Sequence, residues 1–143
     1  MKKPALAASL AALCILAAAA GIAQVARTPS AQGTELYFIA PVDGATITGP
    51  VTVKFGLKGM GVAPAGIQLA NTGHHHLIID AELPPLDKPI PADANHVHFG
   101  MGQTETTVTL APGRHTLQLV LGDHLHIPHQ PAVTSQKITI TVK

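Results

Sequence analysis

Histidine is the residue type in this chain whose spacing most clearly suggests chemistry. The 143 residues include nine histidines, eight of which fall in three groups. In a strand, residues i and i+2 point the same way and lie about 6.5–7 Å apart. Two such imidazoles can converge on one metal ion that lies about 2.0–2.1 Å from each nitrogen. The predicted metal ligands are therefore His74 and His76, His96 and His98, and His124, His126 and His129.

The ligand type restricts the metal. Imidazole without thiolate suits Cu(II), Zn(II) or Ni(II), and no organic cofactor is implied. Copper is the first choice for an exported protein, followed by zinc. Met60 and Met101, each between two glycines, either expose a thioether or fill gaps in the core. Asp80 and Asp123 either orient a histidine or cap a turn or strand end. By strand parity, His75 points away from its two neighbours, so it is expected to be packed in the core.

The elements that must position these histidines have the period of β-strands. Apolar residues alternate with polar ones over residues 51–57, 106–110, 115–123 and 138–142, and no helical period appears after residue 34. Residues 35–143 are therefore predicted to form one all-β domain, an immunoglobulin-like antiparallel β-sandwich of about seven strands.

Such a sandwich gathers its loops at two ends, so histidines far apart in the sequence can meet. If the strand that begins at His74 lies antiparallel beside the strand that ends at Asp123, the first and third histidine groups come together. His115 follows the turn at Pro112 and Gly113, where it is predicted to be a buried corner residue bonded to the backbone.

The first 26 residues have a basic start, an apolar stretch and small residues before a polar segment. This pattern is typical of a helical signal peptide, here with expected cleavage after Ala23 or Ala26. A membrane anchor and a lipidated Cys14 are the alternatives. Residues 27–34 are expected to be a polar linker. Cleavage removes Cys14, leaves no membrane span and predicts a periplasmic or secreted protein.

Four segments, at residues 56–66, 71–80, 95–105 and 121–129, resemble in order the bacterial domain-of-unknown-function family numbered 4399 (DUF4399). The resemblance covers about residues 40–143. It implies a small secreted β-domain and no particular activity.

These observations favour an exported metal-handling module whose partner is a metal ion, with another envelope protein as a further candidate partner. The alternative is a non-catalytic interaction or structural module whose histidines hydrogen-bond loops or sense pH. A His-ligated metalloenzyme is the third hypothesis, and the pattern favours binding over catalysis. The formal charge of +1 argues against a nucleic-acid partner. The sequence also carries no phosphate-binding loop or dinucleotide fingerprint.

Overall fold

The computed structural model describes residues 26–143, which contain nine strands and no helix. The predicted signal peptide lies outside the described residues, except for its last residue. Within the described part, no helix is long and apolar enough to cross a membrane. The strands are β1 (Glu35–Ala40), β2 (Thr46–Ile47), β3 (Val51–Lys58), β4 (Gly61–Val62), β5 (Thr72–Ile79), β6 (His96–His98), β7 (Glu105–Val108), β8 (Gly113–Gly122) and β9 (Ile138–Val142).

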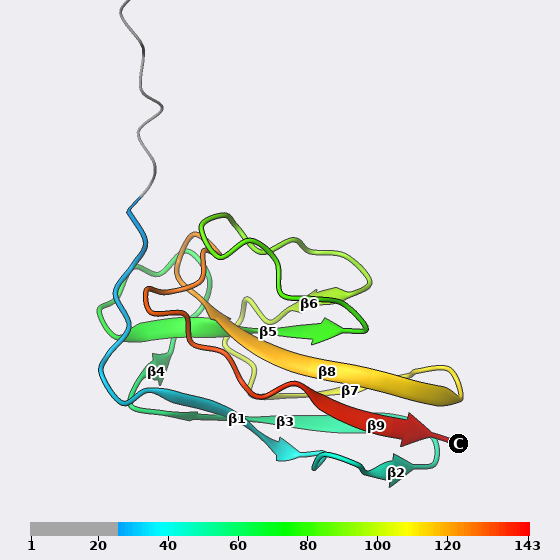
Figure 1. Cartoon of the computed structure of the whole chain (residues 1–143). Helices are drawn as coiled ribbons and strands as arrows, with labels where there is room; N and C mark the ends of the chain where they lie inside the picture. Colours follow the sequence, from blue (N-terminus) through cyan, green and yellow to red (C-terminus); the bar gives the residue numbers. More distant parts are fainter. Residues whose placement is uncertain (1–25) are drawn as a thin grey trace, which may run out of the picture.

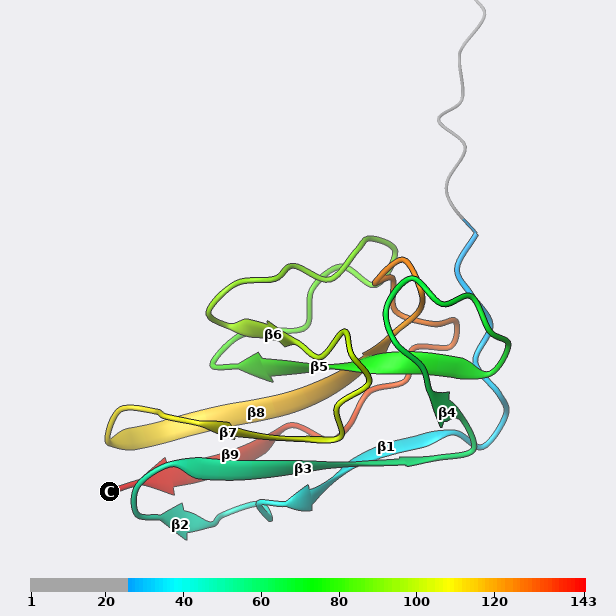
Figure 2. The ribbon, with the colours of Figure 1, turned by 180° about the vertical axis from the view of Figure 1, so that it is seen from behind.

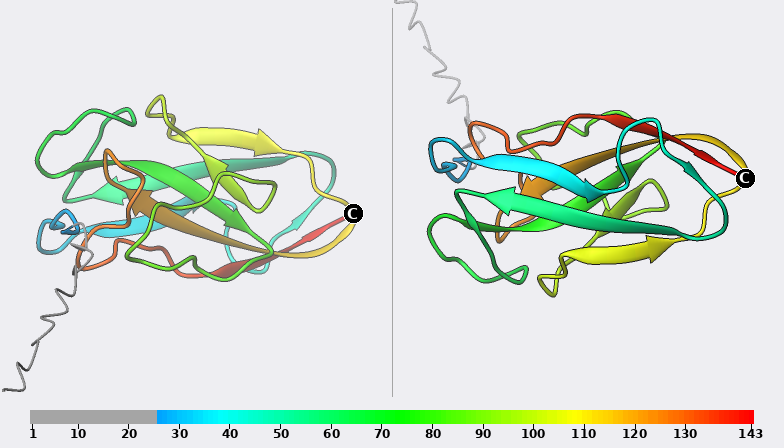
Figure 3. Two further views of the ribbon diagram at one scale, coloured as in Figure 1. Left: turned by 90° about the horizontal axis from the view of Figure 1, so that it is seen from above. Right: turned by 90° about the horizontal axis from the view of Figure 1, so that it is seen from below.

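The strands form two sheets that face each other (Figure 1). The smaller sheet has the order β1-β3-β7, and it faces the viewer in the right panel of Figure 3. The larger sheet has the order β2-β9-β8-β5, with β4 and β6 pairing to successive parts of β5. The long strands pair antiparallel. This arrangement confirms the predicted immunoglobulin-type sandwich.

The core lies between the two sheets and consists of the apolar residues that alternate with polar ones along the strands, as predicted. Val51, Val53 and Phe55 of β3 point inward, and their polar neighbours point to solvent. Leu117 and Leu119 of β8 meet them from the larger sheet. Each such side chain contributes about 1.5–3 kcal/mol when it is fully removed from water.

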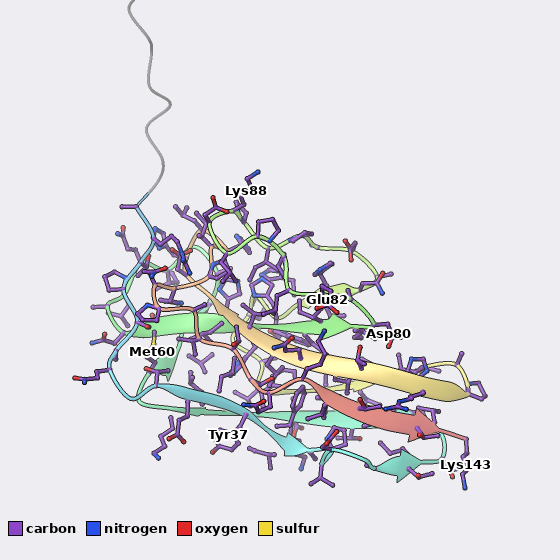
Figure 4. All side chains as sticks on the ribbon, viewed as in Figure 1. Tyr37, Met60, Asp80, Glu82, Lys88 and Lys143 are labelled. Atoms are coloured by element: carbon purple, nitrogen blue, oxygen red, sulfur yellow. The ribbon has the colours of Figure 1, made fainter. Side chains whose placement is uncertain are left out.

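The larger sheet is also covered on its outer face, which the sequence did not predict. Figures 1 and 2 show the segment between β5 and β6 passing over β5 and β8 on the side away from the smaller sheet. Its prolines keep it irregular, and its Ile90 packs on Ile78 and Val120. Figure 4 shows side chains filling this second layer beneath the loop that carries Lys88. Side chains on the outer face of β5 are therefore buried.

His115 is bonded to the backbone at the corner, as predicted, but it is only partly buried because its ring also reaches the Asp80 carboxylate near the surface. Its Nε2 lies 2.8 Å from the carbonyl oxygen of Ala111, and its Nδ1 lies 2.6 Å from Oδ2 of Asp80. Asp80 also accepts a hydrogen bond from the backbone amide of Thr116, so it caps the end of β5. The hydrogen bond that the His115 ring donates to the Asp80 carboxylate, followed by its hydrogen bond to the Ala111 carbonyl, raises the pKa of His115.

This pair predicts a pH-dependent contribution to stability. A raised folded-state pKa stabilises the fold fully below the unfolded value near 6.5, and the contribution is lost as the pH rises through the folded value. We expect His115→Gln to lower the free energy of unfolding by about 1 kcal/mol at most, because the pair is near the surface. The loss should be larger at pH 5.5 than at pH 9 in urea titrations. An equal loss at both pH values would contradict this assignment.

Candidate metal centre

Four histidine rings from three segments lie together on the outer face of the larger sheet. His74 and His76 are neighbours on one face of β5. His98 of β6 is paired opposite His76. His126 lies in the loop that follows β8, whose last residue, Gly122, is paired opposite His74. The antiparallel arrangement expected for the strands that carry the first and third groups is therefore confirmed.

The rings surround a common point at the spacing that a metal ion requires. An ion that lies about 2.0–2.1 Å from an imidazole nitrogen lies about 3.2 Å from the centroid of that ring. Four rings arranged tetrahedrally around the ion would therefore have centroids about 5.2 Å apart. Five of the six centroid distances are 4.7–5.1 Å, and the sixth is 6.0 Å. A square-planar ion would instead require two diagonal distances of about 6.4 Å.

Three of the rings already form a ligand set. His74, His76 and His98 each offer one nitrogen, and these atoms all lie within 4.8 Å of one another. The ring of His126 lies 4.9 Å from that of His74 and 4.8 Å from that of His98, but 6.0 Å from that of His76. His126 therefore lies beside this set, on the side of His74 and His98, and is not one of the three residues whose nitrogens lie within 4.8 Å of one another.

The inner two ligands are buried and lack hydrogen bonds. His74 and His76 are 1% and 0% exposed. Among the described residues, neither nitrogen of either ring has a hydrogen-bond partner. Such orphaned polar atoms are uncommon, because each costs about 1–3 kcal/mol when buried. A metal ion bound between the rings would satisfy one nitrogen of each ring, the one that carries the lone pair.

Electrostatics keep these imidazoles neutral. Burial lowers the pKa of His74 to about 4, assisted by His126 and His98. Burial lowers the pKa of His76 further, to about 2, and the nearby cluster histidines add to this effect. The pKa of His98 is lowered by burial and by His126. Neutral imidazole is the form that coordinates metals, so no proton has to be removed near neutral pH.

Two glycines make room for the rings. A Cβ atom at Gly122 would lie 2.7 Å from Cε1 of His76. A Cβ atom at Gly100 would lie 2.3 Å from Cε1 of His98. Any side chain at either position would displace a ligand ring, so the two glycines belong to the site although they offer no ligand atom.

His126 reaches the cluster through an unusual backbone conformation. Its φ is 67°, in the left-handed region that residues other than glycine rarely adopt. Its amide donates to the Asp123 carbonyl at 2.9 Å. The Oδ1 atom of Asp123 accepts the amides of Leu125 and Ile127, each at 2.9 Å. Asp123 therefore caps the turn that orients His126 toward the cluster. Capping a turn is one of the two roles predicted for Asp123.

Asp123 remains an anion in this setting. Burial alone would raise its pKa, but hydrogen bonds from Thr28, Ile127 and Leu125 hold the pKa below its ordinary value. A charged carboxylate is a stronger acceptor for backbone amides than a neutral one.

The structure does not bring the other three predicted ligands into the cluster. Nδ1 of His96 lies 2.8 Å from Oδ1 of Asp93. The ring of the buried His129 lies between the carbonyl oxygens of Leu121 and Thr72. His124 is partly exposed outside the cluster, and its carbonyl oxygen accepts the amide of Gly66.

His75 has the packed role that strand parity predicted. It is fully buried, and its ring centroid lies 5.0 Å from that of Phe55 in the core. Burial lowers the pKa of His75 to about 4. Met60 packs partly buried against the core, whereas Met101 is exposed.

The four clustered histidines fall within the region that identifies the family of this chain. The profile of the family described as "Domain of unknown function (DUF4399)" matches residues 53–143, so the chain belongs to this family. A search of curated proteins and a search of solved structures each found no match. Since the family description names no activity, the function has to be argued from the site.

The nitrogens of the three buried histidines of β5, His74, His75 and His76, have no hydrogen-bond partner among the described residues, which predicts that these side chains destabilise the metal-free protein. We expect His76→Leu and His75→Leu each to raise the free energy of unfolding by about 1 kcal/mol, because leucine removes buried polar atoms that lack partners. Urea denaturation in the presence of a chelator measures this change. His129→Leu is the control and should lower stability, since it removes a ring bonded to two carbonyl groups. A similar loss in His76→Leu would contradict the argument.

Proposed function

We propose that this member of the DUF4399 family is an exported metal-handling module that binds one transition-metal ion through His74, His76, His98 and His126. The observation that carries the proposal is the set of nitrogens of His74, His76 and His98, which lie within 4.8 Å of one another beside the ring of His126. The imidazoles of His74 and His76 in this set are buried, neutral and without hydrogen-bond partners among residues 26–143. The packed His75 also lacks hydrogen-bond partners in the described part of the chain, so the nitrogens without partners support the proposal because those of His74 and His76 also converge with His98.

Zn(II) and Cu(II) are the candidate ions. An all-imidazole site suits both, and Cu(II) has the higher intrinsic affinity for nitrogen ligands. The near-tetrahedral spacing of the rings favours Zn(II), because Cu(II) prefers a tetragonal arrangement. We therefore propose Zn(II) as the ion that fits with least rearrangement.

The number of ligands supports holding a metal rather than catalysis. Catalytic zinc sites keep three protein ligands and one position for water or substrate. Four imidazoles would fill a tetrahedral shell. His98 is exposed and His126 is partly exposed, whereas His74 and His76 are buried. The ion would therefore enter and leave on the side of His98 and His126.

A matched pair of variants on β6 tests the site. His98→Gln should weaken Zn(II) binding by more than about 100-fold. Mutating a residue that only hydrogen-bonds a metal ligand already lowers metal affinity by about 10–100-fold, and loss of a ligand should cost more. His96→Gln alters the same His-x-His motif outside the cluster and should leave the affinity unchanged. Calorimetric titration with Zn(II) and with Cu(II) measures both.

Equal losses in the two variants would point to non-specific binding by surface histidines. A wild-type protein that binds neither ion more tightly than millimolar would contradict the metal site altogether.

Export is supported by the composition of the first 26 residues and by the scarcity of thiols, since Cys14 is the one cysteine of the chain. Mass spectrometry of the protein recovered from a bacterial envelope fraction should show a chain that begins at Gln24 or Arg27. A full-length chain recovered from the cytosol would contradict export.

A further inference from the structure

We propose that Thr28, which precedes the first strand by several residues, is a positioning residue of the metal site and acts through Asp123 on the loop that presents His126. This inference rests on the proposed metal-binding function. It adds the N-terminal segment of the domain to a site whose ligands all come from residues 74–126.

The contact is short and uses a buried carboxylate. Oγ1 of Thr28 donates to Oδ2 of Asp123 at 2.6 Å. The other carboxylate oxygen, Oδ1, accepts the amides of Leu125 and Ile127, which flank His126. Asp123 is 3% exposed, so water does not readily replace a lost partner. Thr28 thus fixes the orientation of the carboxylate that caps the His126 turn.

The segment around Thr28 is anchored to the far end of the same loop. Gln130 donates its amide to the Thr28 carbonyl at 2.9 Å, and Ser30 donates its amide to the Gln130 carbonyl at 3.1 Å. The Arg27 guanidinium donates to the carbonyl oxygens of Pro128 and His129. In Figure 1 this segment runs beside the loop that follows β8. The loop is therefore tied to residues 27–30 both at Asp123 and at residues 128–130.

The conformation of His126 makes this anchoring relevant to the metal. A left-handed residue other than glycine persists only where its surroundings over-determine it. Here the constraints are the Asp123 cap on one side and the hydrogen bond from the amide of Ile90 to the His126 carbonyl, 2.9 Å, on the other. Loss of the Thr28 hydroxyl would leave Oδ2 of the buried Asp123 carboxylate without this partner. The loop conformation in which His126 faces the other three histidines would then be less populated.

Affinity falls in proportion to the population of the competent state. The coupling is also reciprocal, because a metal that holds His126 in place stabilises the contacts that the same conformation requires. Zn(II) should therefore slow hydrogen exchange at the amides of Ser30 and Gln130, which form the hydrogen bonds between this segment and the end of the loop.

Thr28→Val, Thr28→Ser and Ser30→Ala provide a matched test with Zn(II) alone as the probe. We expect Thr28→Val to weaken Zn(II) binding about tenfold, Thr28→Ser to restore it and Ser30→Ala to leave it within about twofold. Ser30 is the control because its hydroxyl donates to the Pro131 carbonyl, in the same segment but away from Asp123. Hydrogen exchange in the metal-free protein should quicken at Leu125 and Ile127 in Thr28→Val only.

Unchanged Zn(II) affinity in Thr28→Val, or equal losses in Thr28→Val and Ser30→Ala, would overturn the positioning role and leave the proposed function standing. A wild-type protein that does not bind Zn(II) or Cu(II) would overturn the proposed function and this role with it. Faster exchange at Leu125 and Ile127 without any change in affinity would show that the segment supports the loop but not the metal site, which also overturns the proposal.

Discussion

The antiparallel pairing of β5 with β8 determines both faces of the larger sheet. Its register places Leu77 opposite Leu119 on the core side and His74 opposite Gly122 at the metal-site end. Because side chains alternate in a strand, a slip of one residue would turn His74 and His76 into the core and expose Leu77. The apolar core that selects this register therefore also selects which histidines can become ligands.

Burial of the outer face gives the histidine cluster its properties. The covering loop and the turn after β8 remove His74 and His76 from water, which lowers their pKa values and leaves their nitrogens without protein partners. The nitrogens without partners cost stability in the metal-free protein at any pH, whereas the lowered pKa values cost stability only as the pH falls below about 6.5. Both effects favour coordination. An ion that binds only the folded chain would offset this cost by mass action.

Much of this architecture can be predicted from local pattern. The alternation in β3 and β8 indicates a sandwich, the parity of His75 indicates a core position, and the turn before His115 indicates a corner. The proximity of the first and third histidine groups follows from the antiparallel neighbours. In each case, the signal lies within one strand or between two neighbouring strands.

Such local patterns do not predict which histidine of the second and third groups joins the cluster. Both members of a pair point to the same side in an ideal strand, yet His96 turns to Asp93 while His98 joins the cluster. In the third group, the left-handed backbone at His126 and the capped turn separate it from His124. These differences depend on loops, such as the one over β5, whose course is set by tertiary contacts. The closest sequence signals are Gly100 and Gly122, whose missing side chains leave space for His98 and His76.

X-ray absorption spectroscopy of the Zn(II)-loaded protein tests the central claim most directly, because it reports the number and type of ligands without altering the chain. The account predicts four nitrogen ligands at about 2.0 Å with the outer-shell scattering of imidazole. A shell with two or fewer imidazoles, completed by water or carboxylate oxygens, would contradict a centre built from His74, His76, His98 and His126.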